Sequence, residues 1–499
     1  MQPPPPPSPS DEDEANAAPR MYFIPFPTPG HALPMSDLAR LFASRGADAT
    51  LVLTRANAAR LGAPIARAAA AGHRIRVHAL SLPAEAAGLT GGHESADDLP
   101  NRDLAGPFGL AVDLLAPLFA DLLRRDPPDA VVFDGVLPWA ATSAPELASS
   151  VPRYAFTGTG CFALSVQRSL LLHAPHESVP SDATPFVVPG LPDAVRLTRP
   201  RLAEATLPGA HSREFLNRVF AVERATAGWV VNSFDGLERD YVEHYERETG
   251  KPVFAVGPVC LVNGDGDDVL QRGRGADDTD AARRVLAWLD TKPARSVAYV
   301  CFGSLTRFPI EQVEELGLGL AASGENFVWV VGDKNEHFIS PEIDGAVSSG
   351  RGLVVTTWAP QVAVLRHVAV GAFVTHCGWG AVTEAAAAGV PVVTWPVFAE
   401  QFYNEALVVG IAGTGVAVGA KRGYVWGREE SGGVVVGREK VAERVRAAMA
   451  DEALRRRAED VGDRARRAVE AGGSAYVAAG KLLDDVRRRR RERESVVKV

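Results

Sequence analysis

The stretch from Trp358 to Gln401 contains the residue types and spacing that indicate chemistry most directly. Within it, the apolar residues 372–375 run into His376-Cys377-Gly378-Trp379-Gly380, and an alanine-rich run follows at once. This order predicts a strand, a glycine-containing turn and the start of a helix. The free backbone N–H groups and the positive dipole end of such a helix start can bind a pyrophosphate.

His31 and Asp134 are a second candidate for chemistry. His31 follows the apolar run 22–26 in a Pro/Gly loop, and Asp134 ends the apolar run 130–133. If both runs are parallel strands, both side chains lie at the edge of one sheet where open α/β folds bind ligands. Imidazole titrates near neutral pH and can take a proton from a hydroxyl, and a carboxylate can orient it. The alternatives are a structural histidine and an aspartate that caps a helix.

The rest of the pattern predicts the elements that must position these residues. Apolar runs alternating with helical patterns indicate an α/β protein whose parallel sheets are covered by helices on both faces. We predict strands at 22–26, 49–53, 130–133, 154–156, 229–231, 297–302, 327–331, 353–356 and 372–375. We predict helices at 35–44, 310–322, 438–449, 452–470 and 474–491.

The chain has 499 residues, which is too long for a single hydrophobic core, so we predict two domains. Residues 1–20 are proline-rich and then acidic, which predicts a disordered tail. The first domain then covers 21–256 and the second covers 281–470. A Gly- and Asp-rich linker at 257–280 joins them, and 471–499 form a last helix and tail.

Charge and cysteine usage limit the partners and the compartment. The formal net charge of −8 argues against a nucleic-acid partner and favours a soluble enzyme with small substrates. The four cysteines are widely spaced and lack metal-ligand spacing, which suits a reducing cytoplasm. No apolar run approaches the roughly 18 residues of a membrane helix, so we expect no membrane insertion. We also expect a monomer. We interpret the arginines at 487–493 as a solvated helix end, with nucleic-acid or lipid binding as the alternative.

The stretch from Trp358 to Gln401 resembles the signature box of plant family 1 UDP-dependent glycosyltransferases. Its Trp-Ala-Pro-Gln opening, its His-Cys-Gly-Trp centre and its closing glutamine all match, and the wider resemblance runs from Met21 to about Val486. The resemblance implies the GT-B fold, in which two Rossmann-like domains with parallel sheets face a central cleft. It also implies that the last helix crosses back to the first domain.

The same resemblance implies a role for each part of the box. Trp358 and the backbone of Ala359 contact uracil, and Gln361 and Glu384 reach the ribose. His376, Gly303, Ser304 and the helix start after Gly378 hold the phosphates, although Ser304 could instead cap the next helix. Glu400 and Gln401 face the sugar, and Gln401 favours glucose. The predicted UDP-sugar-binding residues are Gly30, Thr157, Gly303, Ser304, Trp358, Ala359, Gln361, His376, Gly378, Trp379, Gly380, Ala381, Glu384, Glu400 and Gln401.

One departure from the family pattern concerns the phosphates. Relatives usually have Asn and Ser where this chain has Gly380 and Ala381, so two side-chain contacts are missing. Each such hydrogen bond to a charged group typically contributes about 1.5–3 kcal/mol, but backbone N–H groups remain and water can substitute. We therefore expect weakened or repositioned donor binding.

Together these features predict an inverting transferase that moves glucose from UDP-glucose to a hydroxyl of a small lipophilic acceptor, such as a flavonoid, a terpenoid or saponin aglycone, or another phenol or alcohol. In this prediction His31 is the general base, Asp134 orients it, and neither a metal ion nor another cofactor takes part. One alternative is a UDP-sugar-binding protein with little or no turnover. Others are transfer to carbon or nitrogen, and another UDP-sugar. A nicotinamide-dependent oxidoreductase is disfavoured because no Gly-x-Gly-x-x-Gly follows the first strand.

Overall fold

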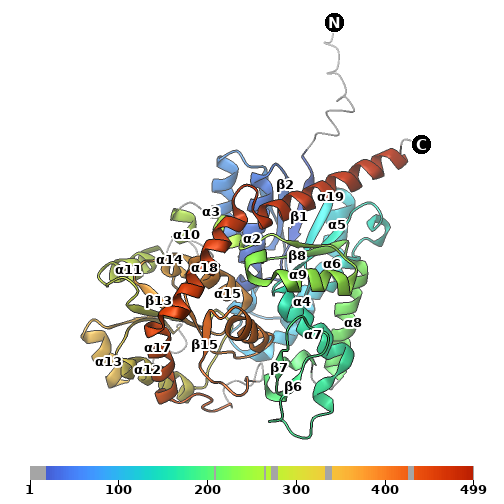
Figure 1. Cartoon of the computed structure of the whole chain (residues 1–499). Coiled ribbons are helices and arrows are strands. Elements are labelled where there is room, and N and C mark those ends of the chain that lie inside the picture. The colour runs from blue at the N-terminus through green and yellow to red at the C-terminus, as the bar shows by residue number, and fades with distance from the viewer. Residues whose placement is uncertain are drawn as a thin grey trace.

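The computed structural model describes residues 18–206, 210–262, 266–270, 279–331, 340–424 and 432–497. Two parallel sheets organise the chain (Figure 1), with strand orders β3-β2-β1-β4-β5-β8-β9 and β12-β11-β10-β13-β14-β15. The first sheet contains β1 (Arg20–Ile24), β2 (Asp48–Thr54), β3 (Ile75–Leu80), β4 (Ala130–Asp134), β5 (Arg153–Thr157), β8 (Gly228–Val231) and β9 (Val253–Ala255). The second contains β10 (Val297–Cys301), β11 (Asn326–Val330), β12 (Gly352–Val355), β13 (Val370–Thr375), β14 (Val392–Thr394) and β15 (Gly415–Ala417). A small antiparallel pair, β6 (Phe186–Val187) and β7 (Arg196–Leu197), completes the strands of the described residues.

Helices connect the strands in both halves. Around the first sheet lie α2 (Pro29–Ser44), α3 (Arg55–Ala70), α4 (Ala105–Asp113), α5 (Leu115–Arg125), α6 (Pro138–Thr142), α7 (Cys161–His173), α8 (Ala210–Ala225) and α9 (Asp235–Thr249). Around the second lie α10 (Gly266–Leu270), α11 (Thr279–Asp290), α12 (Ile310–Ser323), α13 (Pro341–Ser348), α14 (Gln361–Leu365), α15 (Trp379–Ala388), α16 (Gln401–Glu405) and α17 (Arg438–Ala450). The chain ends in α18 (Glu452–Val469) and α19 (Ser474–Val497).

The central strands are buried on both faces, as parallel strands covered by helices must be. Every residue of β4, β5 and β13 is buried. This is why their sequences are continuous apolar runs rather than alternating patterns. The register pairs Ile24 of β1 with Phe133 of β4, so the segments after these two strands begin side by side. The predicted α/β architecture with parallel sheets is therefore confirmed.

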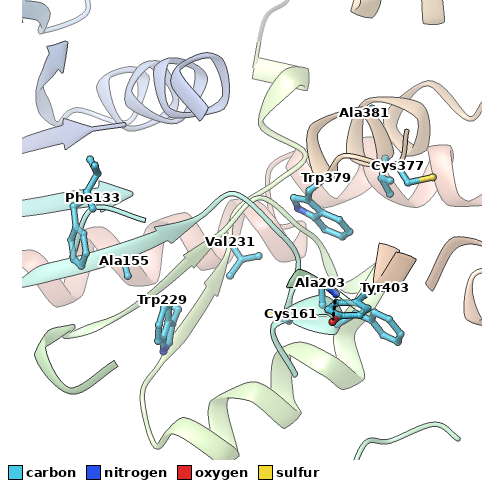
Figure 2. Close-up of a cluster of buried hydrophobic side chains, with 14 of the residues drawn as sticks. Phe133, Ala155, Cys161, Ala203, Trp229, Val231, Cys377, Trp379, Ala381 and Tyr403 are labelled. Carbon is cyan, nitrogen blue, oxygen red and sulfur yellow. Dashed lines mark hydrogen bonds between the residues drawn. The ribbon is translucent and has the colours of Figure 1, made fainter. Parts of the chain in front are cut away.

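One buried core connects the two halves. Phe133 and Val231 of the first half belong to the same apolar cluster as Trp379 and Tyr403 of the second half (Figure 2). The hydroxyl of Tyr403 also accepts a hydrogen bond of 3.0 Å from the backbone N–H of Ala203. The halves are thus joined by packing as well as by the chain.

The last helix, α19, lies against the first sheet (Figure 1). Near its middle Asp485 accepts a hydrogen bond from Tyr154 of β5 at 2.5 Å. Farther along, the guanidinium groups of Arg493 and Arg490 lie 2.8 and 3.5 Å from the carboxylate of Asp129, just before β4. The interpretation of the arginine run as a solvated helix end is wrong for these two residues, because their side chains dock onto the first half.

Other expectations about boundaries need correction. The first helix begins at Pro29 rather than at residue 35, so His31 lies in its first turn and not in a loop. The missing N–H of proline costs nothing at the first position of a helix, and its fixed φ favours that position. Strands β3, β9, β14 and β15 were not predicted. Strands β9, β14 and β15 have only three residues each, too few to stand out as a run, and β3 carries partly exposed polar residues.

The predicted domain boundaries remain predictions. Residues 1–17 of the predicted tail and residues 263–265 and 271–278 of the predicted linker lie outside the described residues. The beginning of that linker is part of the core, since Val259 and Cys260 are 1% and 3% exposed.

The helical stretch Ala105–Arg125 is long and apolar enough to cross a membrane by length and composition. It is divided into α4 and α5, and residues such as Phe108 and Phe119 are buried in the core.

Candidate active site

His31 and Asp134 form a hydrogen-bonded pair at the carboxyl ends of β1 and β4. The Nδ1 atom of His31 lies 2.7 Å from Oδ2 of Asp134. The carboxylate is fully buried and also accepts backbone N–H groups from Phe26 and Val136 at 3.1 and 3.3 Å. It does not cap a helix, because α6 begins only at Pro138. The imidazole is 27% exposed, and the contact of Nδ1 with Asp134 leaves Nε2 for another partner.

Two opposing effects act on the basicity of His31. Burial lowers its pKa, but the Asp134 charge and hydrogen bond and the nearby Glu400 charge raise it more, so the pKa lies above the ordinary value. Glu400 belongs to the second half, which means that both halves influence the imidazole. A carboxylate–imidazole pair of this kind fixes the tautomer with Nε2 available as the proton acceptor.

If His31 acts as the predicted general base, this pKa shift sets the pH dependence of the reaction. A general base works only when neutral, so kcat/KM should fall as the pH falls through the pKa of His31. Because that pKa is raised, the midpoint of the acid limb should lie above the ordinary 6.5. In Asp134→Asn the limb should move to lower pH. Initial rates from pH 5 to 9 check this, and a limb that stays in place would show that another group titrates.

The turn between β13 and α15 packs closely against the segment after β10, and a glycine in each makes this possible. Cys377 has a φ of 64°, in the left-handed region, and Gly378 is the N-cap of α15. The His376 ring lies so close to Gly303 and Gly378 that a Cβ atom at either position would be 2.9 or 2.5 Å from it. The predicted phosphate-binding residues His376, Gly303 and Gly378 are therefore in contact with one another.

His376 contributes to this turn as a neutral group. Burial lowers the pKa of His376 to about 4, so the ring carries no charge at neutral pH. It can therefore supply a hydrogen bond but not the full positive charge that a protonated imidazole would bring. The positive potential at this site comes from the N-terminus of α15.

The residues predicted for the nucleoside lie along the adjacent segment. Trp358 follows β12 and is half-buried, whereas Ala359 is buried. Gln361 is the first residue of α14, and its side-chain amide donates a 2.7 Å hydrogen bond to Glu384 of α15. The two side chains predicted to reach the ribose are thus neighbours.

The residues predicted for the sugar begin α16. Glu400 is the N-cap of this helix and is only partly exposed. Gln401 is 3% exposed, and its carbonyl oxygen accepts hydrogen bonds from the backbone N–H groups of Val397 and Phe398 at 2.8 and 3.0 Å. Its oxygen therefore stabilises the turn, and its –NH2 group is the part that remains for a ligand.

Other predicted residues fall into separate places. Gly30 and Thr157 lie beside His31 rather than in the phosphate-binding turn, since Gly30 precedes it in α2 and Thr157 ends β5 just before Gly158, whose Cβ would be 2.8 Å from the ring. Ser304 is exposed and does not cap α12, which begins at Ile310 after Pro309. A Cβ at Gly380 would meet no atom within 4 Å, and Ala381 is 7% exposed.

The side chain of Trp379, one of the predicted UDP-sugar-binding residues, lies in the contact between the two halves. It is 3% exposed, and its indole N–H donates to the carbonyl oxygen of Asn232, after β8, at 2.9 Å. Figure 2 shows the ring projecting toward Val231 and Cys161 of the first half. The structure therefore places this side chain in the contact between the halves, and only the Trp379 backbone is available to a donor.

Trp379→Phe tests this role, because it retains an aromatic ring and removes the N–H group. The buried carbonyl oxygen of Asn232 then loses its partner, which should lower the unfolding free energy by about 1–3 kcal/mol. Trp395→Phe is the control, since its indole nitrogen is buried with no partner among the described residues. Denaturant unfolding of both variants measures the difference. Equal losses would argue against the Trp379 hydrogen bond.

Sequence reasoning missed a buried carboxylate near these residues. Glu238 of α9 is 3% exposed and accepts the backbone N–H groups of Cys161 and Phe162, at the start of α7, at 2.7 and 3.1 Å. Burial raises the pKa of Glu238 to about 7. Neither its neighbours in the sequence nor its spacing distinguishes it from a surface glutamate, so no sequence signal could have identified it.

Comparison with known proteins identifies the class. The family model described as "UDP-glucoronosyl and UDP-glucosyl transferase" matches residues 275–422. An anthocyanin 3'-O-beta-glucosyltransferase of Gentiana triflora is 39% identical over 93% of this chain and 97% of its own length. A scopoletin glucosyltransferase of Nicotiana tabacum is 38% identical over 93% of this chain and 97% of its own length.

Solved structures agree. A Glycyrrhiza uralensis UDP-glycosyltransferase complexed with glycyrrhetinic acid 3-O-monoglucuronide superposes with a TM-score of 0.88 at 34% identity, covering 96% of this chain and 97% of the other. A Medicago truncatula enzyme complexed with UDP-glucose shares the fold, with a TM-score of 0.78 at 24% identity and coverages of 95% and 100%. The fold is thus GT-B, as predicted, and the protein is a glycosyltransferase. The chain belongs to the plant family 1 UDP-dependent glycosyltransferases.

Proposed function

We propose that this chain is an inverting glucosyltransferase that transfers glucose from UDP-glucose to a hydroxyl group of a small lipophilic acceptor. The observation that carries the proposal is the His31–Asp134 pair at 2.7 Å, because it provides an oriented base in a chain of this family.

The names of the relatives support glucose as the sugar and phenolic acceptors such as anthocyanins and scopoletin.

The reaction follows from the geometry. Nε2 of His31 takes the proton of the acceptor hydroxyl, and the acceptor oxygen forms a bond to the anomeric carbon as the bond to the UDP oxygen breaks. One such displacement inverts the anomeric centre. The departing diphosphate is stabilised by the N–H groups at the start of α15 and by His376. We propose that the transfer needs no metal ion.

The surroundings of His31 support a lipophilic acceptor. The ring of Phe26 lies 5.8 Å from the imidazole, centroid to centroid, and Phe108 lies 6.1 Å from Phe26. Aromatic side chains next to the base favour contact with a flat apolar molecule.

We also propose that the protein is a cytoplasmic monomer without membrane insertion. Its four cysteines are free thiols, which suits a reducing compartment, and light scattering after size exclusion would measure its mass.

The function is tested by measuring UDP release from UDP-glucose with a panel of flavonoid, terpenoid and phenolic-acid acceptors. The proposal expects release that depends on the acceptor and a glucoside product with inverted configuration. UDP binding without release for any acceptor would favour the alternative of a donor-binding protein with little turnover. Transfer to carbon or nitrogen would appear as a product that is not an O-glucoside.

The substitution of Gly380 and Ala381 for the Asn and Ser usual in relatives gives a separate prediction. Because a side chain at 380 meets open space, the double variant Gly380→Asn, Ala381→Ser should fold and add donor contacts. The KM for UDP-glucose should fall by roughly tenfold. Initial-rate kinetics check this, and an unchanged KM would show that backbone contacts already suffice.

A further inference from the structure

Asn404 is a buried residue of α16 that none of the predicted roles uses. Its side chain is 0% exposed. Its –NH2 group donates a 2.9 Å hydrogen bond to the carbonyl oxygen of Cys377 and a 3.4 Å hydrogen bond to Oε1 of Glu400. Both partners can only accept, so the –NH2 group must be the end of the amide that faces them.

The first contact holds the phosphate-binding turn. Cys377 is a non-glycine residue with a φ of 64° and is fully buried. Such a residue keeps a left-handed conformation only where its surroundings hold it. The carbonyl group of Cys377 immediately precedes Gly378, the N-cap of α15, so its orientation sets the direction of the backbone N–H groups that follow.

The second contact holds the sugar-facing carboxylate. Burial raises the pKa of Glu400, whereas its own backbone, the His31 charge and the Asn404 hydrogen bond oppose that rise. The hydrogen bond thus favours the ionised carboxylate, which accepts hydrogen bonds from hydroxyl groups. It also restricts the Glu400 side chain to one orientation.

We propose that Asn404 is a positioning residue that holds the phosphate-binding turn and the Glu400 carboxylate in one fixed relation. This inference rests on the proposed function, because Glu400 matters only if a sugar lies beside it. Oδ1 of Asn404 is buried and has no hydrogen-bond partner among the described residues. An unpaired buried oxygen costs stability. We therefore attribute the presence of Asn404 at this position to the two hydrogen bonds that its –NH2 group donates.

Three variants test the proposal. Asn404→Asp keeps the shape but replaces the donor by an acceptor, and Asn404→Leu removes the polar group. Glu405→Gln is the control, since Glu405 is the next buried residue of α16 and accepts from Thr394 at 2.6 Å, while no hydrogen bond joins it to Cys377 among the described residues. Calorimetric titration with UDP reports on the turn. The ratio of kcat/KM for UDP-glucose to that for UDP-galactose reports on Glu400.

Both Asn404 variants should bind UDP roughly tenfold more weakly and lose most of the preference for one sugar, whereas Glu405→Gln should change neither. Asn404→Leu also leaves the buried carbonyl oxygen of Cys377 without its donor, so its unfolding temperature should fall as well. The sugar preference is the readout that a merely structural role would not move. If wild-type protein binds UDP and a folded Asn404 variant binds and discriminates equally well, the inference is overturned alone. If wild-type protein does not bind UDP, the proposed function falls as well.

Discussion

Replacing His31 with alanine should lower kcat for acceptor-dependent UDP release by about 10²–10⁴-fold, the usual contribution of a positioned general base. The affinity for UDP should stay within about twofold, because the predicted phosphate-binding turn is in the other half of the molecule. Steady-state kinetics with UDP-glucose and calorimetric titration with UDP give the two values. The loss should be largest when the acceptor hydroxyl has a high pKa, since an already ionised phenol needs less help from a base.

The chain offers a matched control for this variant. His367 lies 3.1 Å from Asp290 in a second histidine–aspartate pair, outside the site. His367→Ala should leave kcat unchanged. A similar loss in both variants would mean that His31→Ala acts through the fold and not through proton transfer. Asp134→Asn should retain more activity than His31→Ala, because the imidazole remains while its orientation is lost.

Gly378→Ala should lower kcat/KM for UDP-glucose by about 10²-fold, the cost expected when a binding group is displaced by roughly 1 Å. The added Cβ would lie 2.5 Å from Nε2 of His376. The ring cannot move away freely, because Gly303 lies against it as well. The collision should therefore shift the turn that begins α15, and the KM for the donor should rise while the KM for the acceptor stays unchanged. Kinetics with each substrate varied in turn measure the two constants.

Gly345→Ala is the control for the glycine substitution. Gly345 lies in helix α13 of the same half, and a Cβ there would meet no atom within 4 Å. This variant should keep full activity and gain about 0.5–1 kcal/mol of stability from helix propensity. A Gly378→Ala protein with normal donor kinetics would show that His376 and its turn can move without loss of binding.

Much of the fold was predictable because it depends on local pattern. Buried parallel strands are continuous apolar runs, so most of the central strands could be recognised. The start of α2 was missed because Pro34 looks like a helix break, although Pro29 occupies the position that proline favours. Short edge strands such as β15 were missed because three residues are too few to form a recognisable run.

In the site, the residues of the contiguous box could be predicted from the sequence, but the contacts of individual side chains with distant segments could not. The members of the box from Trp358 to Gln401 are contiguous, so their order could be compared directly with a family pattern. The side-chain roles of Trp379 and Asn404 could not be read in this way. Their partners, Asn232 and Cys377, are defined by contacts between distant segments, at separations of 147 and 27 residues.

The sequence by itself determined the two parallel sheets and the class of enzyme, and it supplied the predicted residues of the donor site. These follow from periodicity and from one contiguous motif, which are visible along a linear chain. Only the tertiary structure decided that Trp379 turns toward the first half, and it brought His31 and Asp134, whose pairing the resemblance implied, to 2.7 Å across 103 residues. Such pairings depend on strand order, register and the packing of the two halves, and long-range contacts of this kind leave no mark on the residues next to them.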